Sequence, residues 1–193
     1  MRPDTDLVPT PSQTVGPFFA IELTTENHCT KQVAGLQAKG ERVWITFRVL
    51  DGDGAPVDDA MLEIWQADTN GKYNHPDDQQ PKPLDPGWIG FGRLATGEDG
   101  SCVLETIRPG RVGRATLPAP HLTVAVFARG MLKQLYTRVY FAGDAANEED
   151  PILQLIPPER RNTLMAQADP DRPGYWSFDV RLQGDQETVF FDV

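Results

Sequence analysis

His121 and Thr123 are the residues whose spacing first suggests chemistry in this chain. The apolar and β-branched side chains of residues 121–127 predict a strand, and alternate residues of a strand share one face. Two histidines in such a pair would offer two imidazoles to a metal ion, whereas a neutral threonine hydroxyl is a poor transition-metal ligand. His121 is therefore expected to be a hydrogen-bonded histidine at the start of a strand.

Tyr73 and His75 form a second candidate group, because they would share a face if their segment is extended. A site made of Tyr73, His75 and His121 can be imagined, but Pro76 disturbs the segment immediately. The sequence has no Gly-x-Ser-x-Gly, no glycine-rich phosphate loop and no Cys-x-x-Cys. The common nucleophile, nucleotide-binding and dithiol motifs are thus excluded.

The composition limits the partners of the chain. Its 193 residues carry 18 Lys and Arg against 28 Asp and Glu, a net charge of −10 with a pI near 4.7. This charge argues against nucleic acid or a membrane as a partner, and an anionic substrate would require a local arginine. Two cysteines suggest no disulfide framework, and neither a signal peptide nor a membrane-spanning apolar run is found, so a cytoplasmic location is expected.

Short alternating segments separated by glycine, proline and aspartate turns predict a mainly β chain. The expected strands are residues 43–50, 60–67, 90–95, 101–107, 121–127, 133–141, 175–182 and 187–193. One helix is expected at residues 157–167, with prolines at its start and an acidic residue in its first turn. Together these elements predict an antiparallel β-sandwich with one short C-terminal helix.

Residues 1–23 are expected to form an extended N-terminal arm, and residues 24–193 a single β-sandwich domain. The prolines and the glycine of the segment from Thr10 to Phe19 are incompatible with a regular helix. Its two adjacent phenylalanines nevertheless demand burial, either on the chain's own core or on another subunit. Backbone around Gly16 and Pro17 could line a pocket, because glycine lets another group approach closely.

Several motifs, taken in order, resemble the intradiol ring-cleavage dioxygenases. They read Ala60-x-Leu-Glu-Ile-Trp-Gln-Ala-Asp-Thr-Asn-Gly-Lys-Tyr73, Gly90-Phe-Gly-Arg93, Thr106-Ile-Arg-Pro-Gly110, Ala119-Pro-His121 and Thr137-Arg-Val-Tyr-Phe141. The segments 10–17, 127–130 and 186–192 narrow the resemblance to family chains that pair with an iron-bearing beta chain to cleave protocatechuate. The resemblance covers nearly the whole chain, and it implies a β-sandwich fold and intradiol cleavage of an aromatic ring.

Active chains of this family bind ferric iron through two tyrosinates and two histidines, which gives a residue-by-residue comparison. Tyr73 and His121 match one ligand of each kind, whereas Val112 and Thr123 stand at the other two positions. Pro118 stands where the family has an arginine. The resemblance implies that Tyr73 and His121 are vestigial metal-site positions and that this chain has neither a catalytic residue nor iron. Fe(III) is then bound by the partner beta chain.

The resemblance also implies which residues this chain contributes to the partner's pocket. Thr14, Gly16 and Pro17 match the arm segment that lines it, and Arg129 matches an arginine there. A guanidinium in a pocket poor in water would attract the carboxylate of a small aromatic substrate such as protocatechuate. Phe18 replaces the family's arm tyrosine, which removes a hydroxyl contact. The reaction with O2 would yield 3-carboxy-cis,cis-muconate.

Two other hypotheses fit part of the sequence. The first is a stand-alone β-sandwich binding module for an aromatic ligand, which the four tryptophans permit and which predicts a stable monomer. The second is an active catechol dioxygenase whose iron is held by Tyr73, His75 and His121. Such a chain would be coloured by charge transfer from tyrosinate to iron, so its colour distinguishes this hypothesis from the others.

Overall fold

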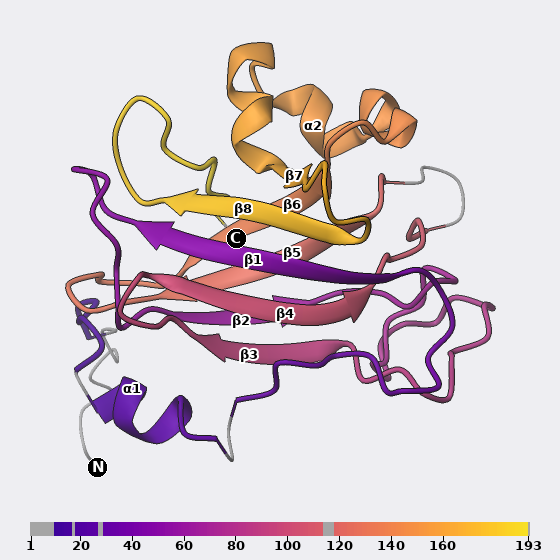
Figure 1. Cartoon of the computed structure of the whole chain (residues 1–193), viewed down its shortest axis with the longest axis horizontal. Coiled ribbons are helices and arrows are strands. Elements are labelled where there is room, and N and C mark those ends of the chain that lie inside the picture. The colour runs from indigo at the N-terminus through magenta and orange to yellow at the C-terminus, as the bar shows by residue number, and fades with distance from the viewer. Residues whose placement is uncertain (1–9, 17, 27–28, 114–117, 193) are drawn as a thin grey trace, which may run out of the picture.

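A computed structural model of the protein describes residues 10–16, 18–26, 29–113 and 118–192 (Figure 1). Its strands are β1 (Arg42–Leu50), β2 (Met61–Trp65), β3 (Phe91–Ala95), β4 (Ser101–Ile107), β5 (His121–Phe127), β6 (Leu135–Phe141), β7 (Met165–Ala168) and β8 (Tyr175–Arg181). Its helices are α1 (Phe18–Leu23) and α2 (Pro151–Leu155), with the 3-10 turns η1 (Ala145–Glu149) and η2 (Pro158–Leu164). Within these residues, no helix is long and apolar enough to cross a membrane.

The strands form one nearly closed sheet in the order β3-β2-β5-β6-β7-β8-β1-β4. The short strand β7 joins two layers, so that β8, β1 and β4 pack over β6, β5 and β2 (Figure 1). Inward-facing residues of both layers, such as Phe47 and Leu104 on one side and Leu62 and Val124 on the other, belong to one fully buried core cluster. The mainly β sandwich predicted from the sequence is confirmed.

Two strand pairs differ from a purely antiparallel sandwich. β1 pairs with β8 in parallel, and β6 pairs with β7 in parallel, whereas the remaining neighbours are antiparallel. β1 and β8 are far apart in the sequence, so no hairpin turn fixes their relative direction. Alternation of side chains predicts that a strand exists, but not the direction of its neighbours.

The helix expected at residues 157–167 is shorter than predicted and is not an α-helix. A 3-10 turn covers Pro158–Leu164, and β7 then extends from Met165 to Ala168, while the α-helix lies earlier, at Pro151–Leu155. Ladder pairing of Met165 and Ala166 with β6 draws this part of the chain into the sheet. The expected strand at residues 187–193 is also not formed, because its described part has a single bridge, from Phe191 to Tyr136.

The described part of the first 23 residues combines an irregular stretch with one short helix. Residues 10–16 contain no regular helix, but α1 begins at Phe18, directly after the proline that ends this stretch. Of the two phenylalanines, Phe19 is partly buried, whereas Phe18 is 77% exposed and Ile21 on the same short helix is 64% exposed. Gln13 and Val15 line a cavity of about 90 Å³ with the turn after β5, so the arm lies at that end of the sandwich.

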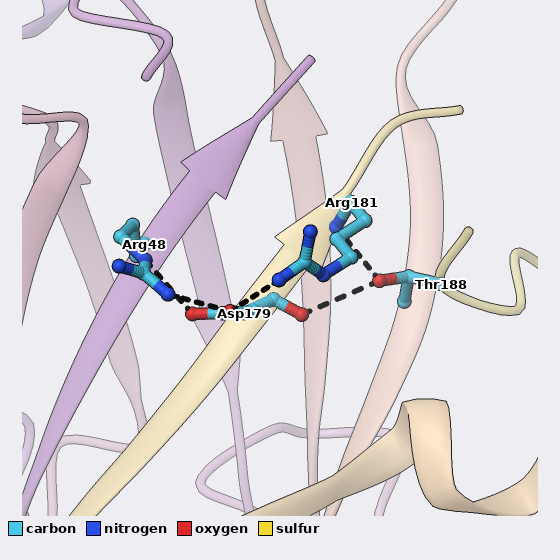
Figure 2. A network of polar contacts seen from close by, with 4 residues as sticks. All are labelled: Arg48, Asp179, Arg181 and Thr188. Atoms are coloured by element: carbon cyan, nitrogen blue, oxygen red, sulfur yellow. Dashed lines mark hydrogen bonds and ion pairs between the residues drawn. The ribbon is translucent and has the colours of Figure 1, made fainter. Parts of the chain in front are cut away.

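The outer face of β1 and β8 is polar, and its charges are paired with one another (Figure 2). Arg48 donates from Nε and Nη2 to the two carboxylate oxygens of Asp179, at 3.0 and 2.8 Å. Arg181 donates from Nη2 to the same carboxylate at 3.1 Å, and its backbone N–H donates to the hydroxyl of Thr188. This side of the sandwich therefore leaves neither arginine without a carboxylate partner.

Candidate functional site

Tyr73, Val112 and Thr123 come together in one open pocket of about 540 Å³, although they lie far apart in the sequence. Trp65 at the end of β2 forms part of its wall. His121 precedes Thr123 by two residues on β5 and is only 5% exposed. The four positions that the family resemblance assigns to metal ligands are thus grouped at one end of this strand.

The turn before Tyr73 is fixed by carboxylates. Asp68 accepts hydrogen bonds from the backbone N–H groups of Asn70 and Lys72, at 2.8 and 2.9 Å. Asp78 accepts the backbone N–H of Tyr73 at 2.8 Å. These bonds close the Asn-Gly turn and set the direction in which the tyrosine side chain leaves it.

Gly71 brings the loop that carries Val112 against this turn. Its φ of +75° lies in the region that favours glycine, and an added Cβ would meet the carbonyl oxygen of Arg111 at 1.9 Å. A side chain at position 71 would therefore separate the two loops. The close approach holds Val112 at the pocket, where the resemblance expects a ligand.

His121 is a hydrogen-bonded histidine at the start of a strand, as predicted. Its Nδ1 bonds the carbonyl oxygen of Ala119 at 2.8 Å. Burial, together with the positive charge of Arg138, lowers the pKa of the imidazole to about 4. The side chain is neutral near pH 7 as a consequence.

Arg138 is a member of this group that the sequence analysis did not single out as a site residue. It pairs directly with Thr123 across β5 and β6, so both side chains lie on the same face. Burial raises the pKa of the Tyr73 phenol, which favours its protonated form, and the charge of Arg138 offsets part of that rise. Knowing that β6 pairs with β5 in this register would have identified Arg138; its own motif did not.

The residues present do not fit a ferric ion. A protonated phenol and one neutral imidazole remain, while valine and threonine occupy the other two positions and a guanidinium adds positive charge. Among the described residues, no group of three or more His, Cys, Asp or Glu side chains could hold a metal ion. His75 borders the pocket, but it is half-exposed, and its Nδ1 accepts the backbone N–H of Asp77 at 3.2 Å.

The residues expected to serve a partner's pocket lie elsewhere. Arg129 follows the end of β5, 64% of its side chain is exposed, and it forms ion pairs with Asp59 and, at 3.7 Å, with Asp58. Thr14 and Gly16 are exposed, and open space surrounds the position of a Cβ at Gly16. Pro17 lies outside the described residues. Since a strand rises about 3.4 Å per residue, Arg129 and Thr123 are roughly 20 Å apart along β5.

Buried His121 should make the chain less stable in mild acid. Its pKa is about 4 in the folded chain and near 6.5 in an unfolded one. The unfolded chain therefore binds a proton that the folded chain excludes, and stability is lost as the pH falls from about 6.5 to about 4. The loss attributable to His121 is about 3 kcal/mol, at 1.36 kcal/mol per pKa unit.

Urea unfolding of the wild type and His121→Asn at pH 7 and pH 4.5 checks this expectation, since carboxylate titration is common to both proteins. The wild type should lose more stability than the variant over this interval. His75→Asn, which removes a half-exposed imidazole that lines the neighbouring pocket, serves as the matched control. An NMR titration that places the His121 pKa near 6.5 would contradict the expected loss.

The comparisons with known proteins define the class. The model of the family described as Dioxygenase matches residues 14–184, which is most of the chain. The fold is also similar to the dioxygenase domain of a dioxygenase–carbohydrate-binding fusion protein from Streptomyces sp. SirexAA-E, with a TM-score of 0.62, 26% identity, and coverage of 91% of this chain and 99% of that one. The chain belongs to the intradiol ring-cleaving dioxygenases.

Its relatives narrow the class to particular chains. It is 46% identical to the protocatechuate 3,4-dioxygenase alpha chain of Burkholderia cepacia, over 98% of this chain and all of the relative. It is 42% identical to the alpha chain of Pseudomonas putida, over 97% of this chain and 98% of the relative. The beta chain of the B. cepacia enzyme is 35% identical over 77% of this chain and 67% of its own length.

Proposed function

We propose that this chain is the alpha subunit of a cytoplasmic protocatechuate 3,4-dioxygenase. It completes the substrate pocket of an iron-bearing beta chain and holds no iron itself. The proposal rests on the combination of two observations: the chain is similar over nearly its full length to alpha chains, and its own pocket has Val112 and Thr123 at two positions where the family resemblance expects metal ligands. The complex would cleave protocatechuate with O2 between its two hydroxylated carbons, giving 3-carboxy-cis,cis-muconate.

The arm end of the sandwich has the surface chemistry of an interface. Phe18, Ile21 and Leu132 are each more than 60% exposed, and their apolar surface gains stability when a partner covers it. Charged Arg129 lies at the same end, after β5. We assign residues 1–23 to an arm that reaches the partner and residues 24–193 to the domain that presents it.

Arg129 is proposed to bind the benzoate carboxylate of the substrate at the partner's pocket. The iron of the beta chain would supply activation of the catechol, while this chain would bind and orient. Asp59 holds the guanidinium in place before assembly, and a planar fork of donors leaves directions free for a second carboxylate. Thr14, Gly16 and Pro17 would form the adjoining wall and exclude water.

Arg129→Ala in the co-expressed complex should raise KM for protocatechuate at least about tenfold, because a hydrogen bond to a charged group contributes roughly 1.5–3 kcal/mol. Iron content should stay at the wild-type level. Catechol, which lacks the carboxylate, should show the same KM with both proteins. Steady-state oxygen uptake and metal analysis measure these quantities.

Arg172→Ala is the matched control, because Arg172 is also two-thirds exposed and paired with one aspartate, Asp169. An unchanged KM for protocatechuate in Arg129→Ala would show that the assigned role is wrong. Iron and turnover in the wild-type chain purified alone would overturn the subunit proposal itself. A stable, iron-free monomer with its own affinity for an aromatic ligand and no binding to a beta chain would favour the stand-alone module.

A further inference from the structure

The pocket at Tyr73 has the dimensions and walls of a small-molecule site. Its volume of about 540 Å³ falls within the roughly 300–1,000 Å³ typical of ligand pockets. Trp65, which is 38% exposed, and Tyr73 provide aromatic surface, and Val112 adds an aliphatic side. Aromatic rings pack well against such walls.

Arg138 gives this pocket a positive charge. Directly opposite residues of an antiparallel pair have Cβ atoms about 5 Å apart, so Arg138 lies beside Thr123 of the pocket wall. Its charge acts on Tyr73, which lines the pocket, and on His121, which shares a face of β5 with Thr123. Its Nη1 donates a hydrogen bond to the Tyr140 hydroxyl at 3.4 Å, which is long for a charged donor.

No carboxylate in the part of the chain that the structure describes forms an ion pair with Arg138. Arg48 and Arg181 in Figure 2, by contrast, share the carboxylate of Asp179. Asp150 is a buried carboxylate that accepts the hydroxyl of Tyr140, the partner of Arg138, and backbone N–H groups occupy its remaining acceptor sites. The guanidinium is left with donors that no anion of these residues satisfies.

The carboxylates at the pocket rim do not reverse this charge. Asp78 is occupied by the backbone N–H groups of Tyr73 and Gln80 and by the Gln80 side chain. The Asp77 side chain is 92% exposed and lies 3.7 Å from His75, so water screens it. Inside the rim, Tyr73 and His121 are uncharged near neutral pH, which leaves Arg138 as the dominant inner charge.

We propose that this pocket binds a small aromatic carboxylate, with the ring against Trp65 and Tyr73 and the carboxylate at Thr123 and Arg138. The ligand is bound without metal and without reaction. The site lies at the opposite end of β5 from Arg129, and it is therefore separate from the pocket that the chain is proposed to share with a partner. Its existence does not depend on that partner.

Titration of the purified full-length chain with benzoate, followed by Trp65 fluorescence, tests the proposal. Saturable binding is expected, and benzamide, which has the same shape without the charge, should bind at least tenfold more weakly. The chain has four tryptophans, and comparison with Trp65→Phe shows which part of the fluorescence change comes from Trp65. Absence of saturable binding up to about 10 mM benzoate, or equal affinity for benzoate and benzamide, overturns the proposal.

Three variants locate the site. Arg138→Gln should weaken benzoate binding at least tenfold, whereas Arg48→Gln, which removes a strand arginine from the other layer, should leave it unchanged. Val112→Phe fills the pocket without touching the arginine and should also abolish binding; circular dichroism establishes that each variant is folded. If Arg138→Gln does not fold, the benzoate affinities of Arg138→Lys and Val112→Phe test the proposal instead. Wild-type affinity in a folded Val112→Phe chain would place any bound benzoate elsewhere and overturn the assignment.

Discussion

Asp150→Ala is expected to lower the free energy of unfolding by about 4 kcal/mol, because it leaves several buried donors without an acceptor at roughly 1–3 kcal/mol each. The Asp150 side chain is fully buried. Its Oδ1 accepts the backbone N–H groups of Ile152 and Leu153, at 2.9 and 2.8 Å, and the hydroxyl of Tyr140 at 3.2 Å. Its Oδ2 accepts the N–H of Ala119 at 2.8 Å.

The expected loss is less than the sum of these bonds, because neighbouring groups relax together. It nevertheless exceeds the loss of a helix cap alone, about 1 kcal/mol, since Asp150 also ties α2 to the segment that enters β5. Urea unfolding measures the effect. Asp150→Asn, which keeps one acceptor oxygen, should fall between the wild type and alanine. Exposed Asp53→Ala should change stability by less than about 0.5 kcal/mol. A loss below 1 kcal/mol in Asp150→Ala would mean that water replaces the carboxylate.

Asp150 also illustrates what the sequence could not reveal. Residues 144–150 include four acidic side chains, a composition typical of exposed segments, yet Asp150 is fully buried. The proline that follows is a signal for a helix start with an aspartate cap. That signal lies in neighbouring residues of the sequence. Burial of the carboxylate, by contrast, depends on Tyr140 and Ala119, which only the folded chain brings next to Asp150.

The strands were predictable because one face of each is buried, which imposes a period of two on β1 and on β4. The structure of the residues after α2 was not predictable, because sheet pairing of β7 overrides a weak helical preference. The candidate site likewise has residues that the sequence could identify and one that it could not. Tyr73 and His121 could be selected by residue type and by resemblance, but the role of Arg138 depends on the pairing of β5 with β6.

Val112→Tyr combined with Thr123→His is expected to leave the chain nearly free of iron, although it restores the residue types that the family resemblance assigns to ligands. The reason is Arg138, which pairs directly with Thr123. A guanidinium beside one of the ligand positions would repel a ferric ion and so weaken its binding. Adding Arg138→Gln removes this repulsion, and the triple variant should approach one iron per chain.

Metal analysis and visible absorption after growth with iron measure the outcome, since tyrosinate bound to ferric iron absorbs visible light. Arg138→Gln alone is the control and should bind no iron, because Val112 and Thr123 still supply no ligand. Stoichiometric iron in the double variant would show that the charge of Arg138 is not the barrier. A colourless triple variant would show that the backbone no longer holds positions 73, 112, 121 and 123 in ligand geometry. The loops would then have changed conformation after the metal was lost. A coloured triple variant would instead show that three side chains account for the whole difference between this chain and an iron-binding one.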